Sequence, residues 1–283
     1  MKKIFKYLGY ILLIALAAVI IFFYRMSAIK SDDSILNSIN NLGHKFELIH
    51  AEYQGVKYRY AVTKNFDQTK PTITLIHGAI GSISTFEKYT KSINSDTANI
   101  VIFDRPNYGN DFNDNYDHTI EFEARLTNDL TANFWSEDSN IVLGFSYGGP
   151  IALFAHALRP YDSIILVSPA IDPDNEVVPP PIYFYKWKLT RPLVPAVWKE
   201  ASKEKLSHVK DLNQHIDLWK NITGNIIHIH GTGDIIAPYK NVEFLKRLID
   251  SRYYNHIPIQ GGGHGSLWDE SEYITDIIIE QLA

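Results

Sequence analysis

From residue 72 onward, short apolar runs alternate with stretches whose apolar residues recur every three or four positions. The runs are nearly continuous, which is typical of strands covered on both faces of a sheet: Thr72–Ile76, Asn99–Phe103, Ile141–Leu143, Ser163–Val167 and Asn225–Ile229. The stretches between them place their apolar side chains on one helical face, in the sets Phe86, Tyr89 and Ile93; Ile120, Ala124, Thr127 and Phe134; and Ile274, Ile277 and Ile278. This alternation predicts an α/β fold with a doubly wound, mostly parallel sheet.

Two β-rich segments precede this alternation. Phe46–Glu52 and Val56–Val62 are separated by Gln54-Gly55, which predicts an antiparallel hairpin at the start of the domain. Residues 27–45 are rich in Ser, Asn and Asp, as expected of a tether or a short surface helix. We therefore expect a linker over 31–45 and one α/β domain over 46–283, with no internal repeat.

The chain begins with an apolar segment. Residues 7–24 carry no charge, and these 18 residues would form a helix of roughly 27 Å, which nearly spans the hydrocarbon core of a bilayer. Because the run continues into Arg25 without a small-residue cleavage site, it favours an uncleaved anchor over 1–30. The alternatives are a signal peptide cleaved after Ala28 and a buried core helix.

Basic residues flank the apolar segment unequally. Three lysines precede it, and one arginine and one lysine follow it closely. By the positive-inside rule this favours a cytoplasmic N-terminus, a single membrane pass and a folded domain on the extracytoplasmic side.

Composition narrows the chemistry. Hydrophobic residues at 45% and charged residues at 21% are ordinary for a globular protein. A net charge of −5 and a pI near 6.1 provide no basic face for a nucleic acid, so we expect no such partner. Because the chain has no cysteine, any covalent nucleophile must be another residue. Nothing in the sequence predicts a cofactor or an oligomeric state.

One glycine-flanked serine stands between a predicted strand and a predicted helix. The segment Gly144-Phe145-Ser146-Tyr147-Gly148 follows the strand that ends at Leu143 and precedes a run that is apolar all round, like a buried helix. Such a strand, sharp turn and helix hold a serine above the sheet, and the small neighbours let the chain turn without collision. Ser146 is therefore the candidate nucleophile.

A serine needs a base and an orienting acid. His264 lies in the glycine-rich run 261–265, just beyond the apolar-ended run Tyr253–Ile259, and is the leading base. Asp234 follows the strand Asn225–Ile229, where an orienting acid belongs, and Asp172 is the rival acid. Metal binding by His228, His230 and Asp234 is the weaker alternative, because neighbouring histidines on a strand are more often packed and no further ligand cluster is present.

With these residues in place, the chain from about residue 46 to its end resembles the α/β-hydrolase superfamily, whose order is nucleophile, acid, histidine. The resemblance implies that Ser146, Asp234 and His264 form a catalytic triad. It also implies that the backbone N–H groups of Ala79, in His77-Gly78-Ala79, and of Tyr147 form an oxyanion hole. His77 is expected to be structural. Asp104-Arg105-Pro106-Asn107-Tyr108-Gly109 resembles a loop of the family in which Asn107 replaces a glycine; asparagine is the next-best residue for positive φ.

The resemblance implies hydrolysis of a carboxylic ester or thioester of a small molecule through an acyl-serine intermediate, without a metal or cofactor. Lipid hydrolysis, acyl transfer and a non-catalytic, membrane-tethered binding module are the alternatives. In this fold, residues 171–221 occupy the position of a lid, and their many Pro and aromatic residues are expected partly to roof an apolar pocket for small or medium acyl groups. Lys186, Lys188 and Arg191 are expected to form a solvated basic face, with contact to lipid headgroups as the alternative.

Overall fold

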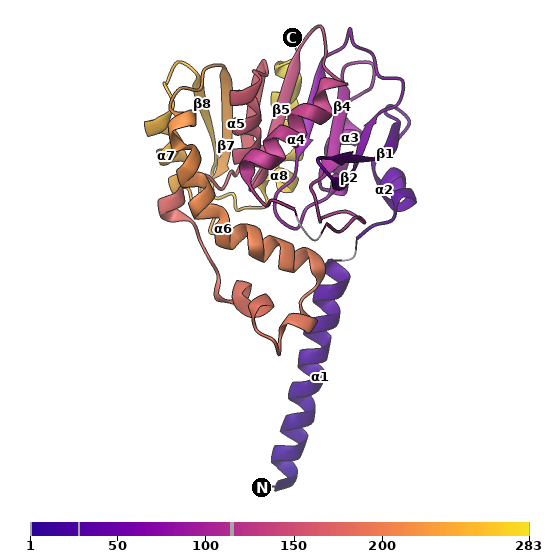
Figure 1. Ribbon diagram of the computed structural model, residues 1–283, viewed down its shortest axis with the longest axis vertical. Helices are drawn as coiled ribbons and strands as arrows, with labels where there is room; N and C mark the ends of the chain where they lie inside the picture. The colour runs from indigo at the N-terminus through magenta and orange to yellow at the C-terminus, as the bar shows by residue number, and fades with distance from the viewer. Residues whose placement is uncertain (1, 28, 114–115, 283) are drawn as a thin grey trace.

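The computed structural model describes residues 2–27, 29–113 and 116–282, and in these ranges eight strands form one sheet in the order β1-β2-β4-β3-β5-β6-β7-β8 (Figure 1). β1 pairs with β2 and β2 with β4 in antiparallel register, and the other neighbouring pairs are parallel. The predicted hairpin and the mostly parallel sheet are therefore confirmed. The strands are β1 Phe46–Tyr53, β2 Val56–Thr63, β3 Thr72–Ile76, β4 Asn99–Asp104, β5 Asn140–Phe145, β6 Ser163–Val167, β7 Asn225–Gly231 and β8 Tyr254–Ile259.

Helices cover both faces of the sheet, as the predicted double winding requires (Figure 1). α2 (Asp32–Ile39), η1 (Ile83–Phe86), α3 (Glu87–Ser92), α8 (Ser266–Asp269) and α9 (Ser271–Glu280) pack on one face. α4 (Ile120–Ala132), α5 (Gly148–Leu158), α7 (Lys240–Leu248) and the later part of α6 (Ala196–Trp219) pack on the other. The three predicted apolar helix faces are buried in these two layers, except that Phe134 lies beyond the end of α4 and is only partly buried against the core.

The strand that leads to Ser146 is longer than the sequence predicted. β5 ends at Phe145, and its pairing with β6 continues to Phe145 opposite Val167. The glycine at 144 masks this end of the strand in the sequence, because glycine is uncommon in strand interiors. Ser146 therefore follows directly on the last paired residue, at the carboxyl edge of the sheet.

The N-terminal helix projects from the domain (Figure 1). α1 spans Lys2–Met26, and its segment Lys6–Arg25 has a mean hydropathy of 2.5 and no buried residue. By length and composition this helix is able to cross a membrane. Ala28, the residue after which cleavage was the alternative, lies outside the described residues.

The segment expected to be a linker is packed against the domain. α2 begins after Ser31, whose hydroxyl accepts a hydrogen bond from the backbone N–H of Ser34, and its Ile35 and Ile39 are completely buried. Asp32 also pairs with Arg59 on β2, with 2.6 Å between Oδ1 and Nη1. Two isoleucines spaced four residues apart are enough to bury one side of so short a helix, although the segment is polar on average.

Residues 171–221 lie between β6 and β7, where the sequence predicted a lid. Three short 3₁₀ helices, η2 (Pro173–Asn175), η3 (Pro180–Lys186) and η4 (Arg191–Leu193), precede the long α6 in this stretch. Figure 1 shows α6 lying across the same end of the domain from which α1 projects.

Candidate active site

Ser146 sits in strained backbone at the end of β5. Its φ is +54°, in the left-handed region that disfavours residues other than glycine, and its backbone N–H donates to Val167 O at 3.0 Å. A Cβ on Gly144 would lie 2.3 Å from the carbonyl oxygen of Gly148, and a Cβ on Gly148 would lie 2.3 Å from that of Ile76. Both glycines are therefore required for the turn to fit between β3 and α5.

The structure brings the three predicted residues into one hydrogen-bonded row. Oγ of Ser146 lies 3.0 Å from Nε2 of His264, and Nδ1 of His264 lies 2.8 Å from Oδ2 of Asp234. The His264 side chain is 15% exposed, whereas the Asp234 carboxylate is fully buried. Nδ1–H donates to the carboxylate, so the unprotonated Nε2 faces the serine hydroxyl.

The loops that carry the base and the acid are held by close backbone contacts. A Cβ on Gly231 would lie 2.2 Å from Gly262 O, so the loop after β8 passes directly over the end of β7. Oδ1 of Asp234 accepts from the backbone N–H groups of Ile236 and Ala237 at 2.9 and 3.0 Å. Burial raises the pKa of Asp234, but the hydrogen bond and charge of His264 and these two N–H groups hold it below its ordinary value.

Asp172, the rival acid, is used elsewhere. Its two oxygens accept hydrogen bonds from the Asp174 backbone N–H at 2.9 Å and from Asn175 Nδ2 at 2.7 Å, which cap η2. The geometry therefore favours Asp234 as the partner of His264.

His228 and His230, the alternative metal ligands, are bonded to one another. Nε2 of His228 lies 2.9 Å from Nδ1 of His230, and Nε2 of His230 lies 2.8 Å from Ala237 O. Because Ala237 O only accepts, His230 carries its proton on Nε2 and accepts from His228 at Nδ1. Burial lowers the pKa of both rings, so they are neutral packing groups behind the Asp234 loop.

The proposed oxyanion amides lie on either side of Ser146. A Cβ on Gly78 would lie 2.8 Å from Ser146 Cβ, so the loop after β3 passes directly beside Ser146. Ala79 follows on this loop and is exposed, and Tyr147 caps the N-terminus of α5. Within the described part of the chain, neither backbone N–H donates a hydrogen bond.

His77 links the two loops behind the site. Its Nδ1 lies 2.7 Å from Gly78 O, and its Nε2 accepts from the Arg105 backbone N–H at 3.0 Å. Burial and the nearby Arg105 charge lower the pKa of His77 to about 3, which fits the expected structural role. Asn107 has a φ of +67°, as predicted for the residue that replaces a glycine in this loop.

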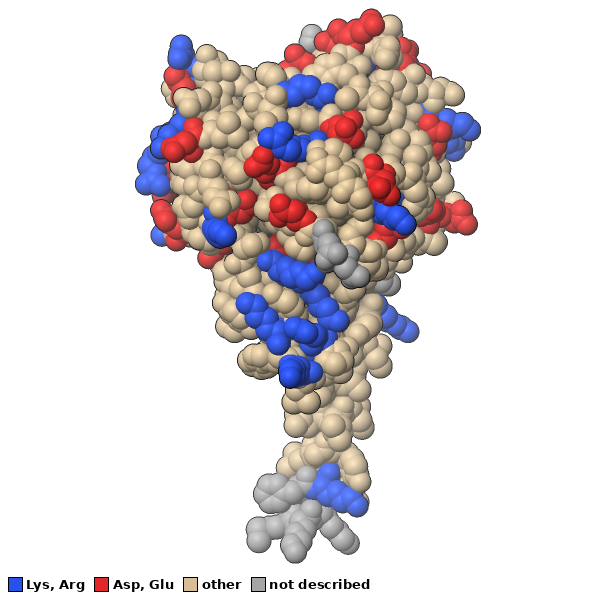
Figure 2. All heavy atoms as spheres, viewed as in Figure 1, with Lys and Arg blue, Asp and Glu red and all other residues tan. Residues whose placement is uncertain are grey.

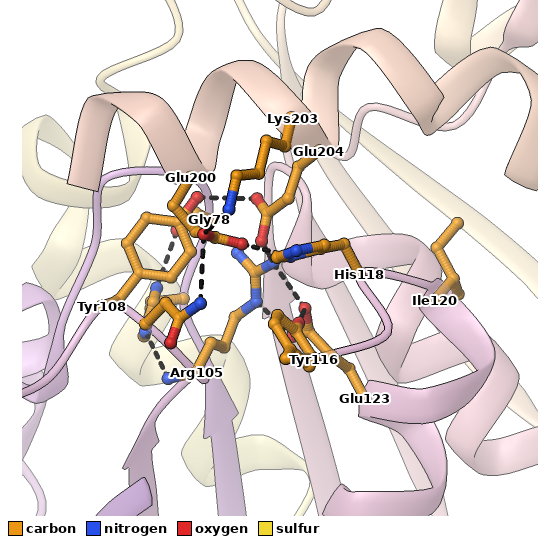
Figure 3. Close-up of polar contacts among 12 residues, drawn as sticks. Gly78, Arg105, Tyr108, Tyr116, His118, Ile120, Glu123, Glu200, Lys203 and Glu204 are labelled. Atoms are coloured by element: carbon orange, nitrogen blue, oxygen red, sulfur yellow. Dashed lines mark hydrogen bonds and ion pairs between the residues drawn. The ribbon is translucent and has the colours of Figure 1, made fainter. Parts of the chain in front are cut away.

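Sequence reasoning missed a buried charge cluster beside Tyr147, the residue after Ser146 (Figure 3). Arg105 donates to Glu123 of α4 through Nε at 2.5 Å and Nη2 at 2.9 Å, and to Glu204 of α6 through Nη2 at 2.5 Å. Its guanidinium carbon lies 4.5 Å from the centre of the Tyr147 ring. All three charged side chains are fully buried.

A second acidic residue of α6 extends this cluster toward the loop after β4. Glu200 accepts from Asn107 Nδ2 at 3.1 Å and pairs with Lys203 and His118 (Figure 3). Burial raises the pKa of Glu200, but these partners, His118 first, hold it below its ordinary value. The cluster, which we call the Arg105 clamp, therefore fixes α6 over the turn that carries Ser146. The alternation of Glu and Lys on α6 gave no signal of this, because such residues usually face solvent.

The aromatic residues of the lid do not gather over Ser146 as a group. Tyr183, Phe184 and Trp187 are 41%, 42% and 56% exposed, whereas Trp219 is completely buried in the core. The prediction that these residues roof Ser146 is therefore wrong. Polar contacts hold α6 to the domain, whereas the chain before α6 runs away from the sheet (Figure 1).

Comparison with known proteins gives one family. A model of the Alpha/beta hydrolase family matches residues 75–273, well over half of the chain, and this range includes Ser146, Asp234 and His264. Among curated proteins, the (R)-3-hydroxydecanoyl-ACP:CoA transacylase of Pseudomonas aeruginosa is 34% identical over 92 residues, which are 31% of this chain and 29% of that protein. The match thus spans less than a third of that relative's length.

Solved structures of similar fold come from several sources. The peroxisomal alpha-beta-hydrolase of Saccharomyces cerevisiae has a TM-score of 0.65 at 16% identity, covering 86% of this chain and 89% of its own. A membrane phospholipase A described as a bacterial virulence factor has a TM-score of 0.64 at 16% identity, covering 100% and 98%. An esterase of Exiguobacterium antarcticum has a TM-score of 0.62 at 18% identity, covering 80% and 96%. At these identities the likeness shows the fold.

Proposed function

Because the chain belongs to the alpha/beta hydrolase family, we propose that it cleaves a carboxylic ester or thioester through an acyl-serine intermediate on Ser146. The observation that carries this proposal is the hydrogen-bonded row from Ser146 Oγ through His264 to Asp234, with separations of 3.0 and 2.8 Å. A serine at a strained turn beside such a base is activated for attack on a carbonyl carbon.

The first half of the reaction forms the acyl-enzyme. Ser146 Oγ attacks the carbonyl carbon while its proton passes to Nε2 of His264, and Asp234 stabilises the resulting imidazolium. The negative charge moves to the carbonyl oxygen, where the N–H groups of Ala79 and Tyr147 are available to bind it. The tetrahedral intermediate then collapses, and the leaving alcohol or thiol takes the proton from His264.

The second half returns the enzyme to its starting state. A water molecule attacks the acyl-serine carbonyl and gives a proton to His264, and the same two N–H groups bind the oxyanion. The acid leaves, and His264 returns the proton to Ser146 Oγ.

Hydrolysis of nitrophenyl esters and acyl thioesters by the purified full chain tests this proposal. We expect turnover that Ser146→Ala abolishes. A folded wild-type chain that binds esters without cleaving any of them would instead support the alternative of a non-catalytic binding module.

Acyl transfer is a second candidate, favoured by the 34% identity to a transacylase over 92 residues. The same acyl-serine would then be resolved by an alcohol or a thiol in place of water. Adding such acceptors to an ester assay separates the two reactions, because a transferase forms the new ester or thioester at the expense of the free acid.

We also propose that α1 is an uncleaved, single-pass anchor and that the catalytic domain lies on the extracytoplasmic side. The length and apolar character of Lys6–Arg25 support the anchor, and the excess of lysine before it supports the orientation. We expect the full chain to stay in the membrane fraction after a carbonate wash and the domain to be accessible to protease in intact cells. Recovery of a mature protein that begins near Lys30 would contradict the anchor.

A further inference from the structure

The part of the lid before α6 is exposed and one-sided in charge. We call this segment, residues 177–194, the lid loop. Its helices η3 and η4 contain no buried residue, and Trp187 and Leu189 are 56% and 86% exposed. Its charged residues are Lys186, Lys188 and Arg191, and it has no Asp or Glu, in a chain whose net charge is −5. A surface that is both apolar and basic in a short stretch of chain differs from an ordinary solvated lid.

The lid loop, through Pro192, and the start of α6, through Trp198, lie against the end of the N-terminal helix. The Tyr24 hydroxyl donates to Pro192 O at 3.2 Å, and Nε1 of Trp198 donates to Oγ of Ser27 at 2.6 Å. The rings of Phe23 and Trp198 meet edge to face, with 5.1 Å between their centres. Figure 1 shows the lid loop extending beside the C-terminal part of α1, and Figure 2 shows basic side chains gathered at this end of the domain.

We propose that the lid loop docks into the headgroup region of the bilayer that holds α1, and that its partner is a lipid surface with anionic headgroups. The inference rests on the anchor proposed above. Aromatic side chains such as Trp187 and Tyr183 are favoured at the boundary between headgroups and acyl chains. With these aromatic residues at the boundary, the ammonium groups of Lys186 and Lys188 lie among the headgroups, where each is attracted to anionic lipid.

Docking would place a cavity of the domain at the membrane. This cavity, of about 250 Å³, lies between the residues just after α1, the loop that follows Ala79 and the start of α6. Its lining is mixed: Ile29, Ile80 and Val197 are apolar, whereas Lys30 and Arg59 are charged. Ile29, Ile80 and Trp198 pack around Tyr108 and Val197 as one apolar cluster. Docking of the lid loop would therefore favour amphiphilic acyl esters of the bilayer as substrates of the proposed hydrolysis.

Charge removal tests the kinetic consequence. The double variant Lys186→Gln, Lys188→Gln removes both positive charges but keeps polar side chains of similar size. It leaves the proposed catalytic residues unchanged. We expect the rate on an acyl ester held in phosphatidylglycerol-containing vesicles to fall on the order of tenfold, while the rate on a water-soluble short ester stays unchanged. Equal rates of wild type and variant on the vesicle-held ester would contradict the electrostatic part of the inference.

The absence of cysteine makes site-specific labelling direct. Full chains carrying Leu189→Cys, Ile279→Cys or Leu16→Cys are labelled with an environment-sensitive fluorophore in nanodiscs that hold one copy each, with and without phosphatidylglycerol. Position 279, an exposed apolar position near the C-terminus at the opposite end of the domain, is the control remote from the membrane for position 189, and position 16 reports insertion of α1 (Figure 1).

We expect lipid-borne quenchers to reduce the emission of the labels at 189 and 16 but not at 279, with the effect at 189 strengthened by phosphatidylglycerol. Quenching at 16 without quenching at 189 would overturn the docking inference and leave the anchor standing. No quenching at 16 would overturn both, while ester hydrolysis by the same samples would still stand. A label at 189 that lipid-borne quenchers leave unchanged, but whose emission changes in nanodiscs loaded with two copies, would overturn the inference in favour of self-association.

Discussion

Two buried polar networks meet at consecutive residues of the chain, and they differ in what they allow a proton to do. Ser146 belongs to the network of His264 and Asp234. The His264 ring is partly exposed, and its hydrogen bonds leave Nε2 able to accept a proton from Ser146. Tyr147 packs on Arg105, whose charge is sealed between two carboxylates of α4 and α6.

This difference assigns proton transfer to one network and structural stabilisation to the other. An imidazole that reaches solvent is able to gain and lose a proton during each turnover, whereas a buried guanidinium is permanently charged and holds its partners in one geometry. The triad network is therefore expected to control activity, and the Arg105 clamp to control stability and the position of α6.

The largest effect is expected in the triad network. His264→Ala removes the base, so we predict a loss of turnover on the order of 10³-fold or more, as for Ser146→Ala. The free energy of unfolding should fall by only about 1–3 kcal/mol, because the buried Asp234 loses one hydrogen-bond partner but keeps two backbone N–H donors. Steady-state kinetics and chemical denaturation of the same samples measure both. Near-normal turnover with a large loss of stability would reverse the roles of the two networks.

The acid assignment gives the next effect. Asp234→Asn leaves the shape of the site but alters the hydrogen bond to Nδ1 of His264, so we predict a loss of at least about 100-fold in turnover, with more residual activity than His264→Ala. Asp172→Asn is the matched control because Asp172 is equally buried and caps η2. A crippling effect of Asp172→Asn beside a mild effect of Asp234→Asn would exchange the two roles.

Breaking the clamp should act on stability. Arg105→Met leaves two buried carboxylates without their cation, which we expect to cost about 3–5 kcal/mol of unfolding free energy. Arg125→Met is the control, because Arg125 makes an ion pair with Glu121 on the same helix α4 as Glu123, but in solvent. An exposed pair of this kind contributes about 0–1 kcal/mol. Equal free energies of unfolding for Arg105→Met and Arg125→Met would show that the Arg105 clamp does not stabilise the fold.

The smallest effect is a dependence of stability on pH. One arginine faces two buried carboxylates, and burial, partly offset by Arg105, raises the pKa of Glu204 to about 8. The folded state then binds a proton that the unfolded state has released, so unfolding free energy should fall as pH rises from about 5 to 8, by on the order of 1–3 kcal/mol. In Glu204→Gln this slope should flatten. If Glu204→Gln kept the wild-type dependence of unfolding free energy on pH, a group other than Glu204 would be responsible for it.

Each residue of the proposed triad has a local signal in the sequence. Ser146 stands in a glycine-flanked turn after an apolar strand, and Asp234 and His264 follow two further strands whose carboxyl ends meet in a parallel sheet. Arg105 and Glu204 have no such signal, since they lie 99 residues apart and Glu204 sits on a helix rich in charged residues. Their pairing depends on how α6 crosses the sheet, which no local pattern encodes.

The central claim is that Ser146 is a nucleophile activated by His264, and covalent labelling of the full chain by a fluorophosphonate tests it most directly. The intact mass should increase by one adduct, mapped to Ser146, that is absent in Ser146→Ala and forms far more slowly in His264→Ala. Ser168→Ala is the matched control, because Ser168 also has a positive φ, of +45°, and also follows a strand, β6, of the same sheet. Its labelling should equal that of the wild type. A folded wild-type chain that stays unlabelled, or an adduct that persists in Ser146→Ala, would contradict the account.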